Sequence, residues 1–166
     1  PERAPPPDAP IGGKARGLAW LTGLGLKVPP ALVLLPSEAP VPLEVLRSHL
    51  GSLGPGPWAV RASASDEDGS EASFAGQYLS VLNVATPEAV QQAVSDCVAS
   101  VASAQAQAYR DTQGEGARAR MAVVIQAMVP AAAAGVLFTL DPVSGRRDRT
   151  VVDAVEGLGE ALVSGH

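Results

Sequence analysis

The sequence predicts an α+β fold for this chain of 166 residues, and two observations support that class. Apolar residues recur at helical spacing over 87–109, which indicates one long helix. Three β-type runs, 121–128, 135–140 and 150–155, follow one another late in the chain. Adjacent strands of this kind beside separate helices are typical of an α+β sandwich.

The first elements are separated by prolines. Residues 1–10 contain five prolines, and we expect a flexible or extended lead-in there. A helix is expected over 13–24. The two prolines at 29–30 then force an extended segment, so the apolar run 31–35 predicts a buried strand. A short helix is expected over 43–50.

A Gly/Pro-rich turn at 51–57 leads into a predicted strand at 58–61. The loop that follows is dense in hydroxyl groups, small residues and acids. A second β-like run is expected at 78–82. Taken alone, these two runs and their loop also fit an ordinary polar hairpin.

The long helix has clear start signals. Thr86 is suited to the N-cap, Pro87 to the first helical position and Glu88 to the first turn. Cys97 falls on the apolar stripe of this helix, so we expect it in the core. The glycine-containing loop at 111–120 is expected to be a hinge between two lobes.

Residues 121–140 carry no charge, which is also a property of membrane spans. Gln126 and Pro130 interrupt the run, so two buried strands joined by a Pro/Ala turn explain it better. A further helix is expected to begin near Leu158.

Composition narrows the function classes. The net charge of −5 and the absence of any Lys/Arg-rich run argue against a nucleic-acid surface. The single cysteine, Cys97, excludes an internal disulfide and a cysteine-built metal site. Neither His49 nor His166 is part of a residue pattern typical of a catalytic site. The first residues do not resemble a signal peptide, so we expect a cytoplasmic protein without membrane or nucleic-acid partners.

The loop after residue 61 has the composition of a phosphate-binding segment. Arg61 stands at a strand end and offers charge with a planar fork of donors. Ser63 and Ser65 are expected to donate to phosphate oxygens, and Gly76 allows the loop to lie over them. We therefore predict that this segment binds a polyphosphate.

A second cation, Lys14, follows two glycines at a predicted helix start, where N–H groups and the helix dipole favour phosphate. The alternative is a helix cap with a solvated lysine. For Arg61 the alternative is an ion pair with Asp66, Glu67 or Asp68. Three consecutive acids do not converge on one ion without a special loop, so we expect no metal there.

Several segments resemble one family in the same order. Residues 60–83 read VRASASDEDGSEASFAGQYLSVLN and resemble the VRSSATAED…SFAGQ…LNV signature of the pyruvate phosphate dikinase and phosphoenolpyruvate synthase family. Further matches to its GGK, VPPGF, VVQ.MV, SGVMFT.DP and WGLGE motifs lie at 12–19, 28–30, 124–129, 135–142 and 156–160. The rifamycin phosphotransferases share this front end.

The resemblance implies an ATP-grasp fold, in which two lobes close on a nucleotide. The first lobe is then expected at 11–110, the hinge at 111–120 and part of a second lobe at 121–166. The segments that normally follow are missing, so the resemblance implies a truncated ATP-binding domain.

The resemblance also assigns roles within the site. It implies that Arg61 and Lys14 bind ATP phosphates and stabilise charge during transfer. It further implies that the backbone around Gln126, Met128 and Val129 recognises adenine. Magnesium ligands are expected outside this chain.

The implied activity is that of a dikinase-type phosphotransferase. ATP would phosphorylate a histidine on a further domain, which passes the phosphoryl group to pyruvate or another acceptor. The phosphohistidine and acceptor domains are expected in the full-length protein or a partner chain. The alternative is a non-catalytic nucleotide-binding or interaction module that has lost the metal site.

Overall fold

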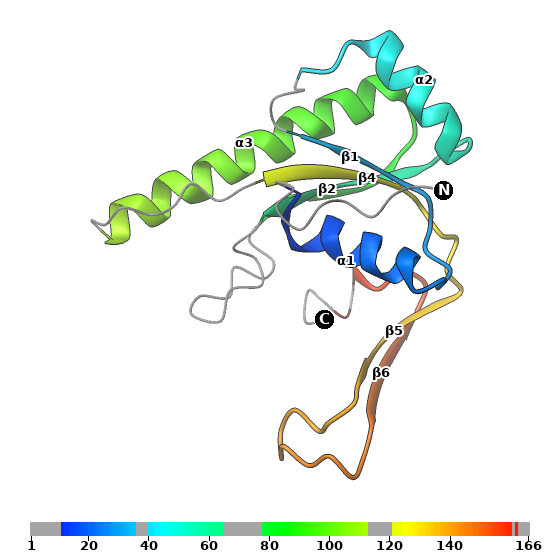
Figure 1. The fold of residues 1–166 in the computed structure, drawn as a ribbon, viewed down its shortest axis with the longest axis vertical. Helices are drawn as coiled ribbons and strands as arrows, with labels where there is room; N and C mark the ends of the chain where they lie inside the picture. The colour runs from blue at the N-terminus through cyan, green and yellow to red at the C-terminus, as the bar shows by residue number, and fades with distance from the viewer. Residues whose placement is uncertain (1–10, 36–39, 65–77, 113–120, 161, 163–166) are drawn as a thin grey trace. The chain divides into compact units, whose positions relative to one another are not determined.

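The computed structural model describes residues 11–35, 40–64, 78–112, 121–160 and 162 (Figure 1). The chain divides into two compact units, Pro1–Met128 and Val129–His166. Both units contain antiparallel sheet, and helices pack in the first, so the chain is a mixed α and β protein. Within the described ranges, no helix has the length and apolar character needed to cross a membrane.

The first unit is built on a four-stranded sheet in the order β1-β4-β2-β3. Its strands are β1 (Ala31–Leu34), β2 (Trp58–Ala64), β3 (Ser80–Val84) and β4 (Met121–Ala127), and all neighbouring pairs are antiparallel. The last strand in sequence, β4, is central, and its first five residues are buried. The edge strand β1 has one neighbour and is only partly buried, which corrects the prediction of a buried strand at 31–35.

The position of β4 also corrects the expected lobe boundary. We expected 121–166 to belong to a second lobe after a hinge at 111–120. Instead β4 pairs with both β1 and β2 of the first unit, and the boundary between the units follows Met128. The physical reason is that β1 and β2 both form their ladder hydrogen bonds with β4.

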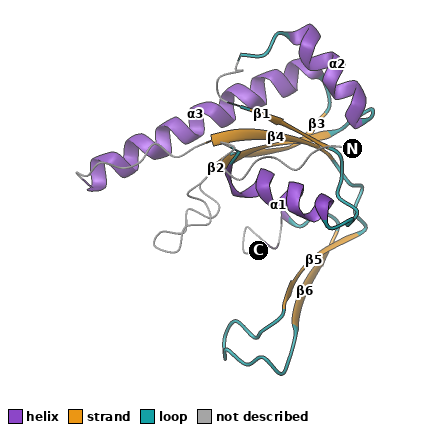
Figure 2. Cartoon of the chain, in the orientation of Figure 1, coloured by secondary structure: helices purple, strands orange, loops and turns teal. Residues whose placement is uncertain are grey.

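Helices cover both faces of this sheet (Figure 2). One face carries α1 (Gly12–Gly23), and the other carries α2 (Leu43–Leu53) and α3 (Pro87–Thr112). The predicted helices are confirmed, although α2 and α3 each run three residues further than expected. The lead-in at 1–10 and residues 113–120 of the expected hinge lie outside the described residues.

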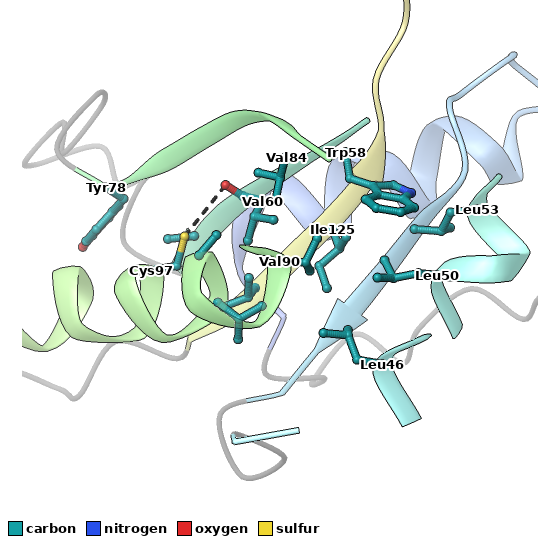
Figure 3. Close-up of a cluster of buried hydrophobic side chains, with 14 of the residues drawn as sticks. Leu46, Leu50, Leu53, Trp58, Val60, Tyr78, Val84, Val90, Cys97 and Ile125 are labelled. Carbon is teal, nitrogen blue, oxygen red and sulfur yellow. Dashed lines mark hydrogen bonds between the residues drawn. The ribbon is translucent and has the colours of Figure 1, made fainter. Parts of the chain in front are cut away.

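The main core lies between the sheet and the pair α2 and α3 (Figure 3). Leu50 of α2, Val60 of β2 and Ile125 of β4 are fully buried there. Cys97 is confirmed as a core residue, and its thiol lies 3.8 Å from the Val60 carbonyl oxygen and 3.5 Å from that of Leu79.

The predicted start of α3 is confirmed in atomic detail. The Thr86 hydroxyl oxygen accepts a hydrogen bond from the Ala89 N–H at 3.2 Å, and the helix begins at Pro87. Glu88 in the first turn forms an ion pair with Arg47 of α2. This exposed pair joins two helices that lie on the same face of the sheet.

The second unit contains a two-stranded sheet of β5 (Ala133–Phe138) and β6 (Val151–Glu156). We expected a buried strand at 135–140, but the side chain of Leu137 is 61% exposed and that of Val136 is 40% exposed. The difference arises because β5 pairs with β6 alone instead of joining the sheet that contains β4. Glu160 and Leu162 have helical backbone, in line with a helix expected near Leu158.

The substitution Leu50→Ala is expected to lower the free energy of unfolding by about 2–5 kcal/mol, because it leaves a cavity in the core. The matched control is Leu24→Ala, since Leu24 is 58% exposed and belongs to the same unit. Urea denaturation of both variants measures the difference. Equal losses for the two leucines would contradict the assignment of this core.

Burial raises the pKa of the Cys97 thiol to about 11 from an ordinary value of 9.0. The folded protein therefore favours the neutral thiol, and this contribution to stability is present below pH 9.0 and is lost as the pH rises towards 11. We expect the wild type to lose more stability than Cys97→Ala over this interval. Urea midpoints at several alkaline pH values measure the difference, and parallel curves would contradict the prediction.

Candidate functional site

The face of β2 that looks towards α1 carries the residues predicted to bind phosphate. Val60 and Ala62 are buried in the core on the opposite face. Because side chains alternate along a strand, Arg61 and Ser63 lie on the α1 face. The structure therefore places both residues on one side of one strand.

The Ser63 side chain is fully buried and makes two hydrogen bonds to the start of α1. Its hydroxyl donates to the Ile11 carbonyl oxygen at 3.1 Å and accepts from the Ala15 N–H at 3.1 Å. A serine hydroxyl has a single proton, and here that proton is given to Ile11. In this arrangement the Ser63 hydroxyl donates within the protein, and its contact with a phosphate oxygen stays a prediction.

The reason lies in the length of β2. The predicted strand ends at Arg61 with Ser63 in a loop, but β2 continues to Ala64. Every residue from Trp58 to Ala64 has a partner on β4, so Ser63 is held in a ladder and its side chain is fixed by the pleat.

A second contact joins the same two segments. Gly12 has a positive φ of 59°, and a Cβ at this position would lie 2.2 Å from the Ser63 carbonyl oxygen. No side chain fits at that distance, so the first residue of α1 packs backbone to backbone against β2. The sequence offered a signal for this contact in its Gly-Gly pair, but Ile11 and Ala15 gave none.

Lys14 is confirmed in the first turn of α1, where its side chain is half-buried. The first four N–H groups of a helix, here those of residues 11–14, have no partner within the helix, and the next one, that of Ala15, donates to the Ser63 hydroxyl oxygen. The first turn contains no acidic residue. The helix dipole, the first N–H groups and an ammonium group therefore combine at one helix end, which favours an anion.

The Arg61 side chain is half-buried, and its Nε atom is buried. Among the described residues, no hydrogen-bond partner of this Nε atom is found. The acids proposed as alternative partners, Asp66, Glu67 and Asp68, lie outside the described residues. A buried donor without a partner is costly, and an anionic ligand on this face would remove that cost.

The segment predicted to recognise adenine lies where the chain passes from the first unit to the second. Gln126 on β4 donates through its side-chain Nε2 to the Pro29 carbonyl oxygen at 3.2 Å. Its amide therefore holds the segment before β1 in place. Met128 is the last residue of the first unit, and Val129 is the first of the second.

Two backbone groups of this segment are already bonded. The Met128 N–H donates to the Pro57 carbonyl oxygen at 3.0 Å, and the Val129 carbonyl oxygen accepts from Ala131 at 2.8 Å. In the described part of the chain, the Met128 carbonyl and the Val129 N–H form no hydrogen bond. The two groups belong to one trans peptide and point in opposite directions, so only one of them is available to a given edge of a base.

The remaining predicted contacts are not tested by the structure. Ser65 and Gly76 lie outside the described residues. In the ranges that are described, no three His, Cys, Asp or Glu side chains form a group that could hold a metal ion.

Comparison with protein families places this site in a nucleotide-binding domain. Residues 43–166 match the family described as pyruvate phosphate dikinase, AMP/ATP-binding domain. This match includes Arg61 and the segment around Met128, whereas Lys14 precedes it.

Curated relatives agree with this match. A rifampicin phosphotransferase of Streptomyces sviceus is 53% identical over 109 residues, covering 65% of this chain and 13% of that protein. The prodigiosin synthesizing transferase PigC of Serratia marcescens is 37% identical over 187 residues, covering 93% of this chain and 21% of its own length. A phosphoenolpyruvate synthase of Aeropyrum pernix is 46% identical over 108 residues, covering 64% of this chain and 13% of its own length.

The chain spans between 13% and 21% of the length of these three relatives. The family match covers residues 43–166, which is most of the chain. The chain belongs to the family of the pyruvate phosphate dikinase AMP/ATP-binding domain.

Proposed function

We propose that this chain is the ATP-binding region of a dikinase-type phosphotransferase with an ATP-grasp fold. One observation carries the proposal. The helix end that bears Lys14 is fastened through Ser63 to the strand that bears Arg61, so that two cations serve the same face of the sheet. Family membership supports the choice of ATP as the ligand.

In this proposal Lys14 and Arg61 bind the phosphates of ATP. Phosphoryl transfer depends mainly on positioning and on the stabilisation of negative charge, which fixed cations and helix N–H groups supply. Arg61 contributes a planar guanidinium whose Nε is already desolvated, and Lys14 contributes a point charge. Ser65 and Gly76 are proposed to complete the phosphate loop.

Adenine is proposed to bind at the Met128–Val129 segment. The edge of adenine presents an amino donor next to a ring-nitrogen acceptor. The Met128 carbonyl is proposed to accept from the adenine amino group; the Val129 N–H belongs to the same trans peptide and points the opposite way, so it takes no part in this contact. In this proposal the two compact units correspond to the first lobe and part of the second lobe of an ATP-grasp domain.

The full reaction requires more than this chain. The described residues offer no ligand set for Mg²⁺, and we propose that its ligands, the phosphohistidine domain and the acceptor domain lie elsewhere in the full-length protein. The relatives include both phosphoenolpyruvate synthases and rifampicin phosphotransferases, so pyruvate and an antibiotic are both proposed acceptors. A cytoplasmic location is part of this proposal.

Removing either cation is expected to weaken the binding of Mg-ATP. A hydrogen bond to a charged group contributes about 1.5–3 kcal/mol, so Arg61→Ala and Lys14→Ala should each raise the Kd about 10-fold to 100-fold. Isothermal calorimetry on the purified protein measures this change.

The controls for these variants are matched in type. Lys27→Ala removes an exposed lysine beyond the end of α1, and Arg47→Ala removes an exposed arginine on the opposite face of the sheet. Both should leave the Kd unchanged. Equal binding by Arg61→Ala and wild type would reject the phosphate assignment, and no binding by wild type would reject the proposed function.

Base recognition makes a separate prediction. Inosine triphosphate has a carbonyl where ATP has its amino group, so it would face the Met128 carbonyl with a second acceptor. An unsatisfied pair of this kind costs about 1–3 kcal/mol, which predicts roughly 5-fold to 100-fold weaker binding than ATP. Competition between the two nucleotides measures the ratio, and equal affinities would contradict backbone recognition of adenine.

A further inference from the structure

We infer that Ser63 is a positioning residue for phosphate binding, which acts by setting where the first turn of α1 stands relative to Arg61. This inference rests on the proposed function, because it concerns the same phosphate site. It differs from a direct ligand contact, since the Ser63 hydroxyl is buried and its proton is given to the Ile11 carbonyl oxygen.

Ser63 attaches the first turn of α1 to β2 at a helix start that has no side-chain cap. Helix α1 begins after Ile11, whose side chain cannot cap the helix, and no side-chain cap bond is formed there. The Ser63 hydroxyl, 48 residues away in sequence, binds the Ala15 N–H instead. The hydroxyl thereby bridges the Ile11 C=O and the Ala15 N–H, the acceptor and the donor of the first i→i+4 pair of the helix, and joins both to the sheet.

The surroundings make this junction rigid. Ile11 and Ala15 are 7% and 2% exposed, and they pack with Ala122 and Val124 of β4. The backbone contact of Gly12 with Ser63 adds a second attachment at the same point. If the hydroxyl is removed, the Ile11 C=O and the Ala15 N–H are left to bond with each other as the first i→i+4 pair of α1, and both lose their hydrogen bond to β2.

The consequence concerns the two cations. Lys14 is the residue before Ala15, and Arg61 lies two positions before Ser63 on the same face of β2, a spacing of about 7 Å along a strand. The same hydroxyl therefore fixes both groups within one rigid unit. Cations that are already held in place bind a phosphate chain without the entropic cost of ordering their side chains.

The test separates phosphate binding from general stability. Ser63→Ala should raise the Kd for ATP about tenfold while changing that for adenosine less than about twofold, because adenosine lacks phosphates. A purely structural role would weaken both ligands together. The matched control is Ser80→Ala, since Ser80 is the β3 partner of Arg61 and is exposed; it should bind both ligands as wild type does.

Coupling to Lys14 provides a second readout. If Ser63 acts by placing the first turn of α1, Ser63→Ala should have little further effect on ATP binding in a Lys14→Ala background. Additive losses would overturn the inference. Equal ATP binding by Ser63→Ala and wild type would also overturn it while leaving the proposed function intact, and failure of wild type to bind ATP would remove both.

If Ser63→Ala does not fold, Gly12→Ala attacks the same junction from the helix side. Its methyl group would lie 2.2 Å from the Ser63 carbonyl oxygen and 2.7 Å from the Ser63 hydroxyl oxygen, so it would push α1 away from β2 while the serine itself is kept. The expected result is again a selective loss of ATP affinity. Unchanged binding of both ATP and adenosine by Gly12→Ala would overturn the inference.

Discussion

The alternation of side chains along β2 is the constraint on which the first unit depends. Val60 and Ala62 belong to the core that packs against α2 and α3, whereas Arg61 and Ser63 face α1. One strand of seven residues thus serves stability on one face and the candidate site on the other. A shift of one residue in its register would bury Arg61 in the core and expose Val60.

Register is held by β4, which pairs with β2 along its whole length and with β1 on its other side. The strand comes from late in the sequence, yet its first five residues are buried. Directly after it the chain enters the second unit through Met128 and Val129. The strand that secures the register of β2 therefore also ends at the segment proposed to bind adenine.

Much of this arrangement could be predicted from the sequence, because the relevant signals are local. The start of α3 was predicted from Thr86, Pro87 and Glu88, and its buried side was predicted from the apolar stripe that includes Cys97. The family motifs identified Arg61 and Lys14 as candidate phosphate-binding residues. Local patterns are less informative about which distant strands pair with each other. For this reason β2 was predicted too short, and β4 was predicted in the second lobe.

By itself the sequence determined three things: the mixed α and β class, the order of the helices and strands, and the family. Each of these follows from the spacing of apolar residues or from short motifs. Only the tertiary structure decided that β4 joins the first sheet and that the Ser63 hydroxyl bonds to Ile11 and Ala15 at the start of α1. Both outcomes depend on partners that are distant in sequence. A serine in a short motif reads the same whether its hydroxyl faces a phosphate or a buried helix end, and only the pleat of β2 settles which.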